Sequence, residues 1–206
     1  ILNNFNTKYK DQINILLLES CSNPNGHIMN FSIIPKLREL SSKLYVIVDN
    51  TWVTSACFNP LTHGADIVIS SMSKHYSGGE CIGGFIISPL VFSKNLLNYI
   101  KINGDHVSLP YCDKFLKNIP LIEERVSKSF NTTLKIAKYL QNHESILEVY
   151  YPLLETHVSY TLASKYFKYG PSVISFAIQL NRNEAKKWMK GFDQINYKTS
   201  FGSHDS

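Results

Sequence analysis

Short apolar runs alternate along the chain with longer segments that have helical spacing. Three apolar runs are rich in aliphatic and β-branched residues and close on polar ones: INILLLES (13–20), LYVIVDN (44–50) and ADIVISS (65–71). Runs of this kind are typical of strands buried on both faces, as in a parallel sheet covered by helices. A fourth strand is predicted at GGFIISP (83–89).

Helical spacing fills segments between and after these runs. FSIIPKLRELSSK (31–43), led by Ser32, predicts a short amphipathic helix. LVFSKNLLNYIKING (90–104) has helical spacing and ends in a glycine. PLIEERVSKSFNTTLKIAKYLQNH (120–143) predicts a longer amphipathic helix. The order of strand, helix and strand predicts an α/β fold.

The pattern changes near Ile122. Beyond it, strands are predicted at ILEVYYP (146–152) and SVISFAIQL (172–180), and helices at HVSYTLASKYFKYG (157–170) and NEAKKWMKGF (183–192). This second part indicates α+β material that follows an α/β sheet, so a boundary is predicted near Ile122.

Composition excludes several classes of protein. The 206 residues are 44% hydrophobic and 18% charged, with a net charge of +5, which is ordinary for a globular domain. The lysines form no basic run and no nucleic-acid-binding module is present, so nucleic acid is not expected as a partner. No apolar run is long enough to span a bilayer, and ILNNFNTKYK (1–10) lacks a signal-peptide pattern, so no membrane contact is expected.

Cysteine and histidine spacing argues against disulfides and metal sites. Cys21, Cys57, Cys81 and Cys112 lie far apart without a C-x-x-C pair, which predicts free thiols in a reducing compartment. The seven histidines show no metal-ligand spacing, so no metal site is predicted.

Polar residues close the three predicted parallel strands. Ligands of open parallel sheets bind beyond the carboxyl ends of the strands, so these residues are the first candidates for a binding site. They are Glu19 to Asn23 after the first strand, Asp49 and Asn50 after the second, and Ser70, Ser71, Ser73 and Lys74 after the third. All three groups are expected to line one edge of the sheet.

This combination contains the parts that a pyridoxal 5'-phosphate (PLP) site requires. A lysine held out of water can form a Schiff base with a carbonyl. Serine hydroxyls can hold a phosphate, and an aspartate can pair with a protonated ring nitrogen. Spacing alone leaves a second interpretation open, in which Lys74 is a solvated strand-end lysine and Asp49 caps the following turn.

The sequence around these residues resembles a known family. VDNTW (48–52) followed by GADIVISSMSKHYSGG (64–79) is similar to the signature of the Cys/Met metabolism (trans-sulfuration) PLP-dependent enzymes, a fold type I family. Its cystathionine gamma-synthases and gamma-lyases are the members that the chain resembles. Further similar landmarks are ESCSNPNG (19–26), VYYP (149–152), the lone His157 and GPSVISFAI (170–178).

The resemblance implies a fold. We expect a PLP-dependent transferase-like α/β domain of the aspartate aminotransferase type, with a mostly parallel sheet, plus part of a smaller α+β C-terminal domain. Residues 1–122 would form part of the PLP-binding large domain, and residues 123–206 the long connecting helix and part of the small domain. The chain would be an internal fragment of a longer enzyme, with active-site parts on either side of it.

The resemblance also implies cofactor-binding roles. Lys74 would form the imine with PLP and act as the catalytic base, and Asp49 would pair with the pyridine nitrogen. Ser71 and Ser73 would bind the cofactor phosphate, while Asn23 would bond the ring hydroxyl. These roles rest on matched motif positions of this sequence.

Outside the cofactor, the resemblance places Ser200, in KTSFG, near Lys74 as the serine that helps seat the substrate carboxylate. Glu19 matches a family acid that we expect to give structural support. Thr199, whose counterpart varies with the reaction among relatives, points to neither a synthase nor a lyase.

Several positions depart from the family pattern. The glycine turn, usually G-H-x-D, reads Gly78-Gly79-Glu80-Cys81, and Ser73 stands for a threonine with its hydroxyl kept. The residues Lys117-Asn118-Ile119 stand for R-G-L, and Cys21 stands for a proline.

The function implied is PLP-dependent elimination or replacement on sulfur amino acids, of the cystathionine gamma-synthase or gamma-lyase kind. The substrate would be a small amino acid, and the full-length enzyme a cytoplasmic homo-oligomer built as a dimer of dimers. The chain alone is expected to be inactive. The alternative is a non-catalytic or truncated homologue with a structural or oligomerisation role only, which the departures and the absent segments favour.

Overall fold

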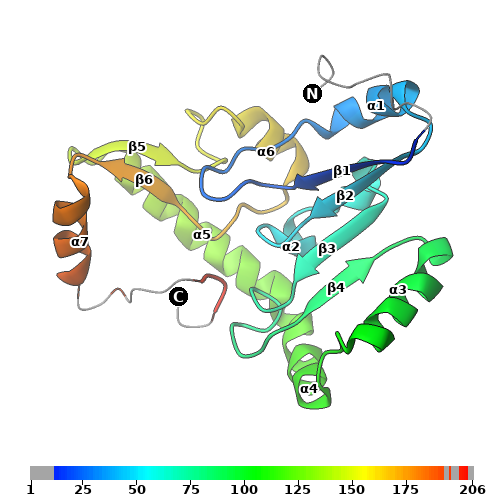
Figure 1. The fold of residues 1–206 in the computed structure, drawn as a ribbon. Coiled ribbons are helices and arrows are strands. Elements are labelled where there is room, and N and C mark those ends of the chain that lie inside the picture. The colour runs from blue at the N-terminus through cyan, green and yellow to red at the C-terminus, as the bar shows by residue number, and fades with distance from the viewer. Residues whose placement is uncertain (1–11, 193–194, 196–199, 204–206) are drawn as a thin grey trace.

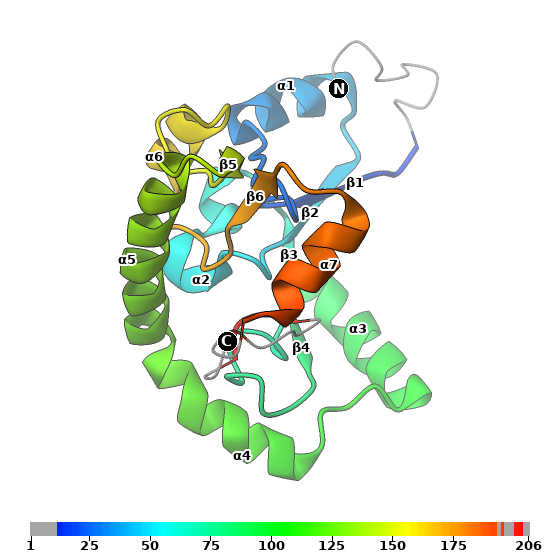
Figure 2. The same ribbon diagram turned by 90° about the vertical axis from the view of Figure 1, so that its left-hand side faces the viewer.

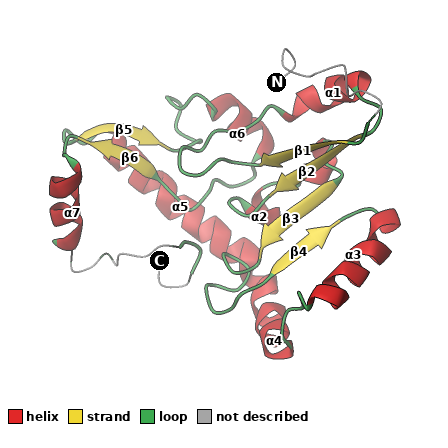
Figure 3. Cartoon of the chain, in the orientation of Figure 1, coloured by secondary structure: helices red, strands yellow, loops and turns green. Residues whose placement is uncertain are grey.

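A computed structural model describes residues 12–192, 195 and 200–203 of the chain (Figure 1). Strands and helices alternate in its first half, and a long helix leads to a strand pair (Figure 3). The strands are β1 (Asn14–Glu19), β2 (Leu44–Asp49), β3 (Ile67–Ser71), β4 (Gly84–Ile87), β5 (Ile146–Tyr150) and β6 (Ser175–Ile178). The α-helices are α1 (Ile34–Leu40), α2 (Thr54–Cys57), α3 (Leu90–Asn103), α4 (Leu109–Asn118), α5 (Ile122–Gln141), α6 (Tyr160–Tyr166) and α7 (Arg182–Lys190).

The first four strands form one sheet in the order β1-β2-β3-β4. β1, β2 and β3 are parallel, and β4 runs antiparallel to β3. The four predicted strands are therefore confirmed, and so is the mostly parallel character of the sheet. β4 can run backwards because its short connection to β3 contains no crossover helix, which a parallel partner would need.

One face of this sheet is buried in the main core. Leu44, Val46 and Val48 of β2 are almost completely buried there. The buried side chains of this core also come from α1, α2, α5 and α6. Of these helices, α2, α5 and α6 lie on the same side of the sheet (Figure 2). Burial of these aliphatic side chains is the main force that holds the sheet to its helices, at roughly 1.5–3 kcal/mol for each fully buried side chain.

The opposite face of the sheet is open along β1 and β4. Ile15 and Leu17 are 65% and 64% exposed, and Ile86 is 48% exposed. Between these strands, Phe92 of α3 packs edge-on against Tyr45 of β2, with ring centroids 5.3 Å apart. The prediction that these strands are buried on both faces is thus wrong for β1, because no described segment covers its outer face.

A second, smaller core lies between α5 and the antiparallel pair β5–β6. Ala137, Val149, Tyr151 and Leu154 are buried in it, and the Tyr151 hydroxyl donates to the Pro171 carbonyl at 3.0 Å. α6 returns to the main core, where Tyr166 packs edge-on against Phe31 with centroids 5.6 Å apart. The boundary predicted at residues 122 and 123 stays a prediction.

The helices differ from expectation in three places, one of which is the short helix α2, which no sequence pattern predicted. Ser32 does not cap α1; the Asn30 side chain accepts from the Ser32 N–H and caps a 3-10 turn that precedes the helix. The sequence pattern did not predict α4, since Pro110 and the polar positions between its apolar residues hide its apolar face. None of the described helices is both long and apolar enough to cross a membrane.

Candidate active site

The carboxyl ends of the three parallel strands meet at one edge of the sheet. Glu19 is in register with Asp49, and Asp49 with Ile69, two residues before Ser71. This arrangement confirms the expected edge, since the polar residues that close each strand share it. The chain leaves β3 at this edge through a turn that carries Lys74.

Lys74 contacts a segment far away in the sequence. Its Nζ donates to the Ser200 Oγ at 2.7 Å and lies 5.1 Å from the centre of the Phe201 ring. Phe201 also packs against Trp52 and His75, with centroids 6.4 and 5.6 Å apart. The amine is thus held between a hydroxyl and an aromatic face, and the segment 200–203 covers the Lys74 turn.

Serine hydroxyls shape the Lys74 turn. The Ser73 Oγ accepts from the Gly83 N–H at 3.0 Å and donates to the Gly83 carbonyl at 3.2 Å. The Ser77 Oγ donates to the Ser73 carbonyl at 3.1 Å. Ser73 directly precedes Lys74 in the turn, but its proton is engaged by Gly83 and must be re-aimed before it can bind a phosphate.

Asp49 and Ser71 lie on adjacent strands and are linked through Thr51. The Asp49 Oδ1 accepts from the Thr51 N–H at 2.9 Å, and the Thr51 Oγ1 accepts from the Ser71 N–H at 2.8 Å. One oxygen of Asp49 thus caps the following turn, as the second interpretation of the sequence has it, and the other makes no hydrogen bond to the described residues. Thr51 was missed, although it stands in the VDNTW motif.

A cavity of about 1130 Å³ opens between this edge and α3. Asp49, Thr51, Ser70 and Ser71 line it on the sheet side. Lys74, Ser73 and Ser200 lie outside its lining, and so does Asn23, which is exposed on the loop after β1. The predicted residues therefore fall into three groups around one edge: Asp49 with Ser71, Lys74 with Ser73 and Ser200, and Asn23 alone.

Two departures from the family pattern have structural roles. Cys21 is almost fully buried, and burial raises the pKa of its thiol to about 12, so it stays protonated. Glu80 in the altered glycine turn lies 3.7 Å from the Lys114 Nζ of α4, an exposed pair that contributes little free energy.

Each of the four cysteines is a free thiol. Thr199 lies outside the described residues.

His75 follows Lys74 and is buried. Burial lowers its pKa from 6.5 to about 4, helped by the cations Arg125 and Lys74 and opposed by a hydrogen bond to the Trp52 backbone. The folded protein keeps the imidazole neutral, whereas the unfolded chain binds a proton below about pH 6.5. The stability that neutral His75 contributes is therefore fully present above about pH 6.5 and is lost as the pH falls towards 4.

We expect acidification from pH 7 to pH 5 to remove roughly 2 kcal/mol of the free energy of unfolding through His75 alone. Urea unfolding at the two pH values measures this loss. Between pH 7 and pH 5, the free energy of unfolding of the variant His75→Gln should fall by about 2 kcal/mol less than that of the wild type. An equal loss in both proteins would show that His75 does not carry this dependence.

Gly202 lets the covering segment approach Lys74. Its φ is +82°, and a Cβ there would lie 2.9 Å from the His75 N and 3.0 Å from the Lys74 carbonyl carbon. We expect Gly202→Ala to push Ser200 off the Lys74 amine, at a stability cost of about 1–3 kcal/mol.

Gly104 provides the matched control for this prediction. Its φ is +72°, but nothing lies within 4 Å of the position of a Cβ, so Gly104→Ala strains the backbone without a clash. Urea unfolding of both variants should show the larger loss of stability for Gly202→Ala, because only its Cβ meets the Lys74 turn. An equal loss in the two variants would contradict the role given to Gly202.

Solved structures of other proteins share this fold. Cystathionine gamma synthase from Xanthomonas oryzae pv. oryzae matches with a TM-score of 0.87 at 24% identity, over 93% of this chain and 50% of that chain. Cystathionine gamma-lyase from Lactobacillus plantarum matches with a TM-score of 0.85 at 24% identity, again over 93% and 50%. These matches confirm the predicted fold class, the fold type I of PLP-dependent transferases.

Sequence comparison identifies the family. The family of Cys/Met metabolism PLP-dependent enzymes matches residues 1–206, and the chain belongs to it. L-methionine gamma-lyase of Fusobacterium nucleatum subsp. polymorphum is 29% identical over 204 residues, which cover 96% of this chain and 51% of the relative. Cystathionine beta-lyase of Coxiella burnetii is 27% identical over 198 residues, or 93% and 50%. The chain spans about half the length of the curated relatives it matches.

The residues present fit the cofactor of this family. Among the described residues, no ion pair includes Lys74 or Asp49, so the amine and one carboxylate oxygen remain available. The Ser70 hydroxyl is buried at the cavity wall and has no hydrogen-bond partner in the described part of the chain. An amine, a carboxylate and hydroxyl groups at one sheet edge are the chemistry that an aldehyde with a ring nitrogen and a phosphate requires.

Proposed function

We propose that the full-length protein is a PLP-dependent enzyme that eliminates or replaces a sulfur-linked or activated side-chain group of an amino acid. The observation that carries this proposal is the position of Lys74. Its amine sits at the carboxyl edge of the sheet, 2.7 Å from the Ser200 hydroxyl, with Asp49 and Ser71 at the same edge. The family and the names of its relatives support the reaction class.

Each residue would act through the group that it presents. Lys74 would attach the cofactor through its ε-amine and then move the proton of the substrate Cα. Asp49 would accept a hydrogen bond from the ring nitrogen and keep it protonated. Ser71 and Ser73 would donate to the phosphate, and the Asn23 amide to the ring hydroxyl. The bound cofactor would supply an electron sink for the charge that develops at Cα.

Ser200 has two tasks in this proposal. Its hydroxyl accepts from the Lys74 Nζ at 2.7 Å and so sets the direction of the amine. When the amine moves to the substrate, the hydroxyl becomes free to donate to the substrate carboxylate. The Phe201 ring lies 5.1 Å from the Nζ and makes a cation–π contact with the amine on that side.

Borohydride trapping tests the proposal. The full-length protein is saturated with PLP, reduced with borohydride and digested, and the peptides are mapped. The expected result is a cofactor label on the peptide that contains Lys74. A folded, saturated protein that carries no label there would exclude the enzyme and favour the non-catalytic homologue.

We further propose that the enzyme acts in the cytoplasm as a tetramer of two dimers, as the family resemblance implies. The open apolar face of β1 and β4 supports association, since a large exposed apolar patch marks a surface that another segment or subunit covers. Light scattering after size exclusion should give four times the mass of the full-length chain; a monomer would contradict the assembly.

A further inference from the structure

The loop that carries Asn23 is held by the C-terminal half of the chain. This segment, residues 22–30, is called the Asn23 loop below. Four hydrogen bonds cross to it: His157 Nε2 to the Asn25 carbonyl (2.9 Å), Ile28 N–H to Ser159 Oγ (3.0 Å), Ser175 Oγ to the Pro24 carbonyl (2.8 Å) and Tyr166 OH to Asn30 Oδ1 (2.9 Å). The loop follows β1, but its position is set by residues near and after α6.

The internal bonds of the loop fold it without fixing it in place. The Ser22 carbonyl accepts from the Gly26 N–H at 2.8 Å, and the Ser22 Oγ accepts from the His27 N–H at 3.0 Å. Gly26 has a φ of +70°, and a Cβ on it would lie 2.9 Å from the Pro152 Cδ. The tight turn therefore rests directly on the segment that leads to His157.

His157 is the member of this clamp whose side chain joins two backbones. Its Nδ1 accepts from the Ser159 N–H at 3.1 Å, so the proton of the neutral ring is on Nε2, which donates to the Asn25 carbonyl at 2.9 Å. One ring thus connects the start of α6 to the residue two positions after Asn23.

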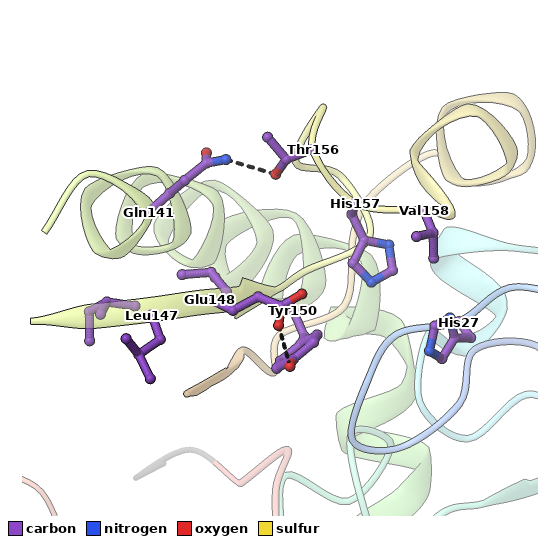
Figure 4. Close-up of a pocket in the computed structure, with 10 residues that line it drawn as sticks. His27, Gln141, Leu147, Glu148, Tyr150, Thr156, His157 and Val158 are labelled. Atoms are coloured by element: carbon purple, nitrogen blue, oxygen red, sulfur yellow. Dashed lines mark hydrogen bonds between the residues drawn. The ribbon is translucent and has the colours of Figure 1, made fainter. Parts of the chain in front are cut away.

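The surroundings favour the neutral form of this ring. Burial lowers the pKa of His157, and the nearby His27 adds to this, while the Asn25 carbonyl and Glu148 oppose it. His157 and His27 both line one pocket (Figure 4). The cavity measures about 300 Å³, and the two ring centroids lie 5.8 Å apart. A second proton would remove the acceptor at Nδ1 and with it the bond to Ser159.

Other polar groups of this cavity are occupied with one another. The Tyr150 hydroxyl donates to Glu148 at 2.5 Å, and the Gln141 amide donates to Thr156 Oγ1 at 2.7 Å (Figure 4). Neither pair includes the Asn25 carbonyl, which is bound by the His157 ring.

We propose that His157 is a positioning residue, which fixes the Asn23 loop and so holds the Asn23 amide in place for the cofactor ring. The clamp rests on the four hydrogen bonds, and the task of Asn23 rests on the proposed function. His157 does not touch the cofactor; it acts through the backbone of Asn25.

Two variants of the full-length protein separate the bonds of His157. His157→Asn keeps an acceptor near the position of Nδ1 but cannot reach the Asn25 carbonyl, whereas the longer His157→Gln can donate to it. We expect His157→Asn to speed amide hydrogen exchange in the Asn23 loop roughly ten-fold and to weaken apparent PLP affinity roughly ten-fold. Its visible absorbance with PLP should match that of Asn23→Ala, and His157→Gln should recover most of both effects.

The double variant His157→Asn with Asn23→Ala should bind PLP no more weakly than Asn23→Ala alone, since both changes act on one contact. Tyr151→Phe is the stability control: it removes a buried hydrogen bond to Pro171 that does not reach the loop. A spectral change in Tyr151→Phe like that of His157→Asn would overturn the proposal.

Unchanged exchange in the Asn23 loop of His157→Asn would also overturn it. So would faster exchange without any change in PLP affinity or absorbance, because the loop would then be held without placing Asn23. If the wild type takes up no PLP, the proposed function fails separately, and the exchange rates alone support or overturn the clamp.

Discussion

We expect the variant Lys74→Ala of the full-length protein to lower the proposed turnover of a sulfur amino acid by at least about 1,000-fold. The variant would lose both tasks proposed for Lys74, which are the attachment of the cofactor and the transfer of the Cα proton. The Ser200 hydroxyl, 2.7 Å from its Nζ, cannot replace it, since a hydroxyl is a far weaker base at neutral pH. Steady-state kinetics and the borohydride label together measure the two losses.

A small primary amine in solution distinguishes a chemical loss from a structural one. Ethylamine can carry the proton that Lys74 carries, so it should restore part of the turnover of Lys74→Ala. Lys101, exposed in the last turn of α3, supplies the control Lys101→Ala, which should keep wild-type turnover. If Lys74→Ala kept more than about a tenth of the activity, Lys74 would not be the reacting amine.

The strands of the first sheet were predictable because their sequences are continuous aliphatic runs. β1, β2 and β3 fall within the predicted ranges, and the polar residues at their ends meet at one edge. Two general facts gave this edge: parallel strands align their carboxyl ends, and an apolar run that stops abruptly marks such an end.

The contacts of Lys74 could not be obtained from spacing. The amine meets Ser200 and Phe201 because the chain returns to the sheet edge more than a hundred residues later, which no local pattern encodes. The family resemblance placed Ser200 near Lys74, but it did not indicate the ring of Phe201. Thr51 was not predicted for a different reason. Its hydroxyl accepts from the Ser71 N–H on the neighbouring strand, which is a tertiary contact.

The open face of β1 shows a limit of hydrophobic patterns. Ile15 and Leu17 read as buried because they are apolar, yet they are largely exposed in the described part of the chain. An apolar run indicates that a face tends to be buried, but it does not indicate which segment covers that face. The same limit applies to His157, whose sequence neighbours suggest only a helix start, while its ring joins two distant backbones.

Phe31 links the sheet core to α6, and its loss should have the largest effect on stability. The side chain is 1% exposed, its ring lies 5.0 Å from Phe58 and 5.6 Å edge-on from Tyr166, and α6 follows directly on His157 and Ser159. Truncation to alanine leaves a cavity that the surrounding rings cannot fill. We expect Phe31→Ala to lower the free energy of unfolding by about 4 kcal/mol, measured by urea unfolding with circular dichroism.

Two further variants make this expectation specific. Phe31→Leu keeps most of the volume and should cost less than about 1.5 kcal/mol, whereas Phe176→Ala, on the half-exposed strand β6, should cost about 1 kcal/mol or less. Because Phe31 adjoins the bond between Asn30 and Tyr166, Phe31→Ala should also speed exchange in the Asn23 loop. A loss in Phe31→Ala no larger than in Phe176→Ala would show that α6 is held to the sheet by the hydrogen bonds of the loop and not by the aromatic core.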